Sequence, residues 1–284
     1  MENTATLLVC CPDRKGLVAA LAQVLYGHGA NILHADQHTD PIAGQFFQRI
    51  EFDHSELHTD RQSVETAIGE VADRFSMTWR LTDSDRRSRM AIFVSKYDHC
   101  LYDLILRQKS GELSADIPLI ISNHADLQPI AEQFGIPFHH LPITKDTKRA
   151  QEDAAIELLQ AADIDLIVLA RYMQILTKEF LTAYSNQVIN IHHSFLPAFM
   201  GSKPYQRAYE RGVKLIGATA HYATADLDEG PIIEQDVVRS SHSDSVQDLV
   251  RKGRDLEKVV LARAVRWHLD DRVLVYDNKT VVFS

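Results

Sequence analysis

The chain has 284 residues, of which 45% are hydrophobic, so it is long enough for about two domains with buried cores. Its formal net charge of −9 argues against a nucleic-acid-binding protein, because such proteins present a basic surface. Three cysteines do not make a disulfide framework, the N-terminus lacks the features of a signal peptide, and no apolar run is long enough to span a bilayer. A reduced, cytoplasmic compartment is therefore expected.

Residues 5–82 have the pattern of a small α+β unit. Strands are expected over residues 5–11, 31–39, 45–52 and 77–81, and helices over residues 17–25 and 61–75. This βαββαβ order predicts a ferredoxin-like fold. Residues 84–89 contain no apolar side chain, so they are expected to link this unit to a second domain.

From Met90 onward, strands and helices alternate, which predicts a doubly wound, mostly parallel α/β sheet. Strands are expected over residues 90–94, 118–122, 138–141, 164–169 and 187–192, with helices over residues 102–108, 127–134, 147–162 and 176–184. Strands at 216–222 and 232–238 are expected to be antiparallel additions, followed by a long helix at 245–269 and a terminal hairpin. The predicted domains are thus residues 1–83 and 90–284.

Two polar side chains end the apolar strand expected at 187–192. Asn190 and His192 are two positions apart, so they would point to the same face of a strand, whereas His193 would point the other way. An amide beside an imidazole suits polarising a carbonyl and moving a proton. Ligands of open α/β sheets bind at the carboxyl ends of the strands, where this pair stands.

An isolated Asn-x-His pair could equally be a cap or a turn, but two nearby loops favour a site. Residues 169–176 follow the neighbouring buried strand with mixed apolar and aromatic side chains. The loop at 225–231 can bring a carboxylate to the imidazole. Spacing alone does not choose among Asp226, Asp228 and Glu229.

These segments resemble the folate-dependent formyltransferases, and the resemblance covers residues 90–284. Asn190-Ile191-His192 matches the catalytic asparagine and histidine of that family, and Leu227–Ile233 matches the loop with its catalytic aspartate. The resemblance therefore implies that Asn190, His192 and Asp228 are catalytic. It also implies folate binding by Met173, Gln174, Ile175, Leu176 and Thr224, although an arginine is more usual where Gln174 stands.

The choice of acceptor separates the members of this family. Glycinamide ribonucleotide formyltransferases hold a phosphate on a loop with glycine and serine, but residues 95–100 contain no glycine and include Asp98, which would repel a phosphate. The run at 192–199, followed by Lys203-Pro204-Tyr205, resembles the formyltetrahydrofolate deformylase family, and His193 stands where transformylases tend to have proline. This resemblance implies hydrolysis of 10-formyltetrahydrofolate to tetrahydrofolate and formate, a reaction that feeds one-carbon and purine metabolism, with no prosthetic group and no metal.

In the implied mechanism, water attacks the formyl carbon. Asn190 and protonated His192 stabilise the oxyanion, His192 moves protons, and Asp228 orients its imidazole. His193 is expected to contact the water or folate, or to pair with a neighbouring loop. The alternatives are formyl transfer to an amine acceptor and a non-catalytic sensor of folate or an amino acid.

The first domain resembles ACT domains, and residues 11–18 and 29–32 carry the resemblance. It implies a regulatory or assembly module in which Asp13, Gly16 and Asn31 bind an amino-acid effector of the glycine or methionine class. A homo-oligomer is expected for the same reason. The alternative is that these three residues are only turn and cap residues.

Overall fold

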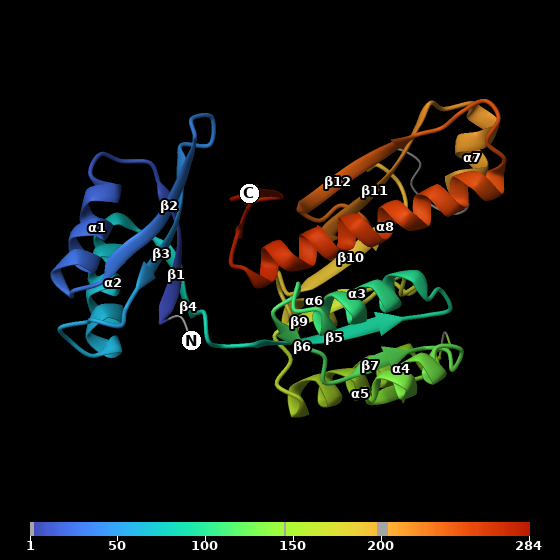
Figure 1. Ribbon diagram of the computed structural model, residues 1–284, viewed down its shortest axis with the longest axis horizontal. Coiled ribbons are helices and arrows are strands. Elements are labelled where there is room, and N and C mark those ends of the chain that lie inside the picture. Colours follow the sequence, from blue (N-terminus) through green and yellow to red (C-terminus); the bar gives the residue numbers. More distant parts are fainter. Residues whose placement is uncertain (1–2, 145, 198–203) are drawn as a thin grey trace. The chain divides into compact units, whose positions relative to one another are not determined.

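The computed structural model describes residues 3–144, 146–197 and 204–284, and its elements are labelled in Figure 1. Contacts between Cα atoms divide the chain into two compact units. The first unit contains the chain up to Arg87 together with Asp271–Tyr276 and Val281–Ser284. The second unit contains Ser88–Asp270 and Asp277–Thr280.

The first unit has the ferredoxin-like order that the sequence predicted. Its elements are β1 (Thr4–Pro12), α1 (Leu17–Gly27), β2 (Asn31–Asp40), β3 (Gln45–Asp53), α2 (Arg61–Phe75) and β4 (Thr78–Asp83). The antiparallel sheet has the order β2-β3-β1-β4. One face of β1, including Leu7 and Val9, packs with Leu21 of α1 and Ile68 of α2.

A C-terminal hairpin, β13 (Val273–Tyr276) and β14 (Lys279–Val282), follows the second unit in sequence. Phe283 and apolar hairpin side chains cluster with Leu8 and Phe47, which lie on the other face of the first sheet because strand side chains alternate. Residues 271–276 and 281–284 therefore belong to the first unit, whereas the sequence analysis placed all of 90–284 in the second domain. The hairpin prediction itself was correct, but its packing partner could not be read from its own residues.

The second unit is a mixed sheet covered by helices. Its elements are β5 (Ser88–Val94), α3 (His99–Lys109), β6 (Ala115–Asp116), β7 (Ile120–Ser122), α4 (Gln128–Phe134), β8 (Phe138–His140), α5 (Lys148–Ala161), β9 (Leu166–Leu169), α6 (Lys178–Ala183), β10 (Val188–His192), α7 (Pro204–Arg211), β11 (Leu215–Tyr222), β12 (Ile232–Arg239) and α8 (Val246–Leu269). The sheet order is β12-β11-β10-β9-β5-β7-β8, with the unpredicted β6 beside β5. β5 and β7–β10 are parallel, and β11 and β12 are antiparallel, as expected.

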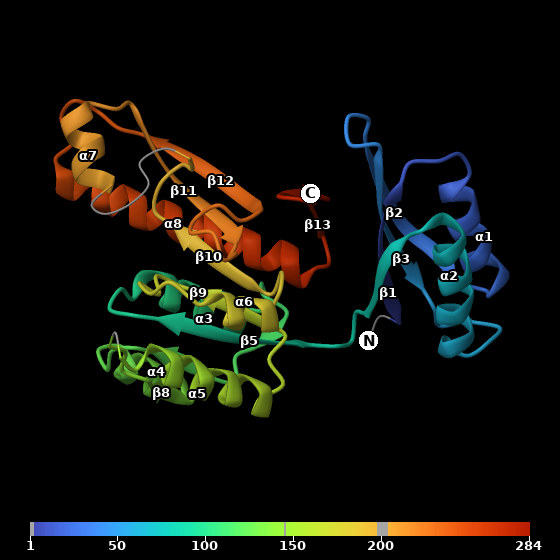
Figure 2. The same ribbon diagram turned by 180° about the vertical axis from the view of Figure 1, so that it is seen from behind.

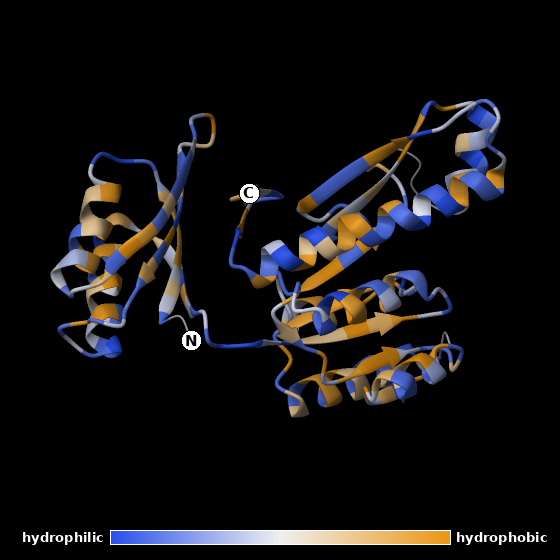
Figure 3. Cartoon of the chain, viewed as in Figure 1, coloured by the Kyte–Doolittle hydropathy of each residue, from blue (hydrophilic) through white to orange (hydrophobic). Residues whose placement is uncertain are grey.

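Apolar side chains on both faces explain this layering. Phe93 of β5 and Ile167 of β9 pack with Leu159 of α5 and Phe180 of α6. Helix α8 runs along β11 and β12, as Figures 1 and 2 show. The strands β5 and β7 are strongly hydrophobic in Figure 3, while the segment that leads into β5 is hydrophilic. Within the described ranges, no helix has both the length and the apolar character needed to cross a membrane.

Candidate active site

The carboxyl ends of the central strands converge on one pocket of about 770 Å³. The order of the strands reverses between β5 and β9, because β7 and β8 follow β5 on one side whereas β9 and β10 lie on the other. Ligands of doubly wound sheets bind at such a point. All the residues predicted for catalysis and folate binding line this pocket, namely Asn190, His192, Asp228, Met173, Gln174, Ile175, Leu176 and Thr224.

Asp228 and His192 form a close pair. Asp228 Oδ1 lies 3.2 Å from His192 Nδ1, and both side chains are largely buried. Burial acts to raise the pKa of Asp228, but the hydrogen bond and charge of His192 outweigh it and hold that pKa below its usual value. The other ring nitrogen, His192 Nε2, has no hydrogen-bond partner in the described part of the chain. It is therefore the nitrogen available for chemistry.

Asn190 is held by a residue that the sequence analysis missed. His221 stands directly opposite Asn190 in the antiparallel pairing of β10 with β11, and Asn190 Nδ2 lies 3.1 Å from His221 Nε2. His221 Nδ1 lies 3.0 Å from the carbonyl of Tyr222, so Nδ1 donates there and Nε2 accepts from Asn190. Burial lowers the pKa of His221, which keeps its imidazole neutral, as this arrangement requires. The pairing of two antiparallel strands was the signal that could have found His221.

The loop that carries Asp228 is fixed by its backbone. Asp228 adopts a left-handed conformation with φ of 58°. A Cβ on Gly230 would lie only 1.8 Å from the carbonyl oxygen of Tyr222, so a side chain cannot be accommodated there. Asn278 Nδ2 donates to the Glu229 carbonyl at 2.8 Å, and the Thr280 hydroxyl donates to the carbonyl of Ile232, the first residue of β12. These contacts hold the carboxylate at the imidazole, which explains why Asp228 and not Asp226 pairs with His192.

The segment predicted to bind folate is anchored at its first residue. The backbone N–H of Met173 donates to Ser95 Oγ at 3.0 Å, and Ser95 donates in turn to Asn123 Oδ1 at 2.6 Å. Met173 and Ile175 are 53% and 55% exposed, so they present apolar surface to the pocket. An apolar strip with a fixed backbone suits a flat aromatic ligand.

His193 lies in the same pocket, which corrects the expectation that it points away from Asn190 and His192. Its ring centroid is 5.0 Å from that of His192. The strand β10 ends at His192, so the alternation of strand side chains does not extend to His193. Burial, reinforced by the positive charges of Arg171 and His192, lowers the pKa of His193 to about 4. No hydrogen bond joins its Nδ1 to any described residue. Its contact with water, folate or a neighbouring loop stays a prediction.

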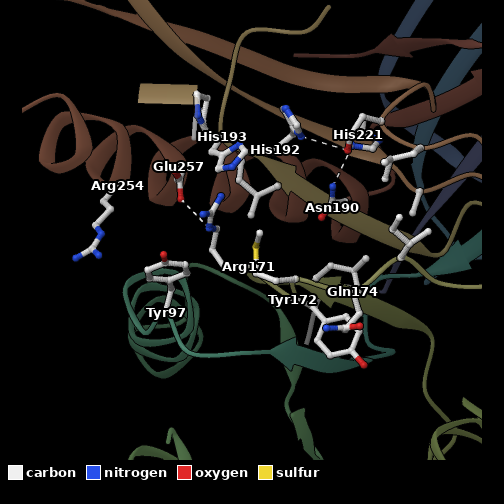
Figure 4. Close-up of a pocket in the computed structure, with 18 of the residues that line it drawn as sticks. Tyr97, Arg171, Tyr172, Gln174, Asn190, His192, His193, His221, Arg254 and Glu257 are labelled. Carbon is white, nitrogen blue, oxygen red and sulfur yellow. Dashed lines mark hydrogen bonds and ion pairs between the residues drawn. The ribbon is translucent and has the colours of Figure 1, made fainter. Parts of the chain in front are cut away.

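A second cluster of charged and polar side chains on the pocket wall is centred on Glu257, which is 1% exposed. Its carboxylate contacts Arg171 (Figure 4). It also contacts His99, and Tyr205 donates to it. His99, Cys100 and Glu257 have ligand atoms within 4.8 Å of one another. Burial and Glu257 raise the pKa of the Cys100 thiol well above its usual value. A carboxylate on the buried stripe of α8 was the sequence signal for this cluster.

The residues predicted for an effector lie in the first unit. Asp13 and Gly16 lie in the turn between β1 and α1, and Asn31 begins β2. All three are exposed. Gly16 has φ of 94° and precedes α1 without a side-chain cap. Two parts of the predicted family motif, residues 198–199 and Lys203, lie outside the described residues.

Comparisons with known proteins agree with this geometry. A family model described as formyl transferase matches residues 88–265, and one described as ACT domain matches residues 5–69. The chain is 60% identical to a formyltetrahydrofolate deformylase of Synechocystis sp., with 100% of both chains covered. The chain belongs to the formyltetrahydrofolate deformylase family. The family, the two folds and their order along the chain are as the sequence predicted.

Solved structures define the extent of the likeness. The crystal structure of a formyltetrahydrofolate deformylase from Pseudomonas syringae pv. tomato is 50% identical, with a TM-score of 0.96 over 99% of this chain and 94% of that chain. The structure of glycinamide ribonucleotide transformylase 1 from Symbiobacterium toebii is 30% identical, with a TM-score of 0.67 over 71% of this chain and 97% of that chain. Deformylases therefore match the whole chain, whereas this transformylase matches only part of it.

Proposed function

We propose that this chain hydrolyses 10-formyltetrahydrofolate to tetrahydrofolate and formate with Asn190, His192 and Asp228 as its catalytic residues. The assignment of these residues rests on one observation, the pairing of Asp228 with His192 Nδ1 at 3.2 Å. This pairing leaves Nε2 available for proton transfer beside Asn190. Full-length similarity to deformylases supports the reaction.

The pterin ring lies against the strip Met173–Leu176, with Thr224 on the opposite loop. The exposed Met173 and Ile175 supply apolar contact, and the anchored backbone supplies hydrogen-bonding groups to the ring edge. This places the formyl group, which is attached at N10, next to the catalytic residues.

Hydrolysis then requires one proton carrier and one oxyanion donor. Water attacks the formyl carbon, a C–O bond forms, and His192 takes one of the two water protons. The C–N10 bond then breaks as His192 passes that proton to N10. Asn190 uses one amide N–H on His221 and keeps the other for the oxyanion. Such a donor contributes roughly 10²–10³-fold, and proton transfer by an imidazole roughly 10²–10⁴-fold. The second water proton leaves as formic acid ionises to formate.

The test is an assay of formate release from 10-formyltetrahydrofolate. The parent protein is expected to release formate without any amine, and His192→Ala is expected to lose nearly all turnover. His140→Ala is the matched control, because His140 is exposed and does not line the pocket. Normal turnover by His192→Ala would refute the mechanism. No formate from the parent would leave a sensor role as the better explanation.

For the first unit, we propose that the turn at Asp13 and Gly16, with Asn31, binds an amino acid of the glycine or methionine class. The match to the ACT family supports binding of an amino acid, and the uncapped N–H groups of α1 can hold a carboxylate. Titration calorimetry on the full chain should detect binding that an Asn31→Ala variant weakens. The absence of heat with either amino acid would contradict the proposal.

The proposal also includes a homo-oligomer, built through the ACT-like unit, in the cytoplasm. Light scattering on the purified chain checks the first part, since a monomer mass at micromolar concentration would contradict it. The low cysteine content supports the reduced compartment.

A further inference from the structure

Glu257 is a buried carboxylate that the proposed hydrolysis does not use. Its partners come from three other parts of the chain. His99 Nε2, at the start of α3, lies 2.8 Å from Oε2, and the Tyr205 hydroxyl of α7 donates to Oε1 at 2.6 Å. Arg171 Nε, just after β9, lies 3.5 Å from Oε2. We call Glu257, His99, Arg171 and Tyr205 the Glu257 cluster.

Both carboxylate oxygens of Glu257 are already paired, whereas His99 Nδ1 and Arg171 Nε have no hydrogen-bond partner among the described residues. A carboxylate that is 1% exposed is stable only when it is paired, because its desolvation costs several kcal/mol. Burial acts to raise the pKa of Glu257, but His99, Arg171 and Tyr205 outweigh it and hold that pKa below its usual value. The ionised carboxylate thus receives a donor on each oxygen, and the charge of Arg171 balances its own.

The packing of Tyr205 shows how closely the cluster is fitted. A Cβ on Gly253 would lie 2.1 Å from the Tyr205 hydroxyl oxygen, so the helix α8 has no side chain where this ring lies. Tyr205 is only 9% exposed and packs with Leu249 of α8. The hydroxyl therefore reaches Glu257 through a gap that only a glycine leaves.

The cluster lines the part of the pocket wall that neither the proposed folate strip nor the catalytic residues occupy. Figure 4 shows Gln174 and Asn190 toward one side, Glu257 and Arg171 toward the other, and His192 and His193 above them. With the pterin on the strip that includes Gln174, the attacking atom arrives along the remaining wall. An amine entering there meets no free carboxylate oxygen and no net negative charge.

We propose that the Glu257 cluster determines acceptor specificity: it closes the acceptor side with a carboxylate whose two oxygens already have donors, so that water reaches the formyl carbon and an amine does not. The inference rests on the proposed function. With water, a C–O bond forms, the C–N10 bond breaks and N10 gains a proton. With an amine, a C–N bond forms instead, and the proton that the amine loses goes to N10.

The test measures how the formyl group divides between water and a small amine. Purified full-length protein is given 10-formyltetrahydrofolate and glycinamide at mildly alkaline pH, and N-formylglycinamide and formate are quantified. The parent is expected to give formate almost exclusively. Tyr205→Phe frees Oε1 for an amine N–H, and His99→Ala frees Oε2 and opens space beside it. Each variant is expected to raise the ratio of N-formylglycinamide to formate roughly tenfold.

Arg254→Ala is the matched control for these variants. Arg254 lines the same pocket from α8, but its guanidinium lies over the ring of Tyr97 and not at Glu257. Its product ratio is expected to equal that of the parent. A ratio raised equally by Arg254→Ala would mean that any widening of the pocket admits amines, which would overturn the role of the cluster.

Two further results would overturn the inference. One is an unchanged ratio in Tyr205→Phe, which keeps the ring volume and decides the question even if His99→Ala does not fold. The other is a parent that formylates glycinamide as fast as it releases formate. No formate from the parent would refute the proposed function itself, and this outcome is distinct from an unchanged ratio.

Discussion

Replacing Asp228 by Asn should disable the proton carrier while leaving the pocket in place. The side chain keeps its size, but the negative charge 3.2 Å from His192 Nδ1 is lost. That charge matters most when His192 is protonated during the reaction. Two unit charges about 4 Å apart at an effective dielectric constant of 20 attract by about 4 kcal/mol. Since the Asp228 side chain is 13% exposed, this value for a mostly buried pair applies.

A loss of about 4 kcal/mol from the transition state corresponds to about a 10³-fold lower kcat. KM should change by less than about threefold, because Asp228 lies opposite the strip proposed to hold the pterin. The assay is formate release under saturating and limiting 10-formyltetrahydrofolate, so that kcat and KM are separated.

Asp226→Asn provides the matched control. Asp226 is an exposed carboxylate in the same loop, and its backbone carbonyl accepts hydrogen bonds from Thr224 and Glu229. Its kcat should stay near that of the parent. If Asp228→Asn retained kcat within tenfold of the parent, or if Asp226→Asn were the more damaging change, the assignment of Asp228 as the orienting carboxylate would be refuted.

Three further predictions test the electrostatics and packing. The folded pKa of His193 is about 4 against an ordinary 6.5, so between these values the unfolded chain binds more protons and the free energy of unfolding decreases as the pH is lowered. His193→Gln should remove about 2 kcal/mol of this decrease by about pH 5, measured by urea denaturation, and an unchanged pH slope would contradict it. Gly230→Ala should displace the Asp228 loop, because its Cβ would lie 1.8 Å from the Tyr222 carbonyl oxygen, and should lower kcat at least about tenfold; parent-like kinetics would show that the loop adapts. Phe283→Ala should destabilise the first unit by about 3 kcal/mol, whereas Ser284→Ala should not, and equal urea midpoints would show that the tail does not contribute to that core.

The outcome for the tail bears on how the first unit can be studied. Residues 1–83 alone would lack Phe283 and expose Leu8 and Phe47, which the C-terminal segment covers. Effector binding is for this reason best measured on the full chain.

The sequence by itself determined the fold classes and most of the proposed site. Periodicity placed the strands and helices because an apolar face must be buried whatever its partner is. Asn190 and His192 could be placed together because residues two apart in a strand share a face. The folate strip and the identity of Asp228 came from resemblance to a family, since spacing leaves Asp226 and Glu229 equally available.

Only the tertiary structure decided which distant residues meet. His221 reaches Asn190 through the register of two antiparallel strands, and register is set by the whole sheet. Glu257 gathers His99, Arg171 and Tyr205 from separate elements, so no local pattern contains the cluster. His193 enters the pocket because β10 ends one residue earlier, and Phe283 covers the first sheet although it lies at the far end of the chain. In each case the physical reason is a contact between segments far apart in sequence, which local propensity does not encode.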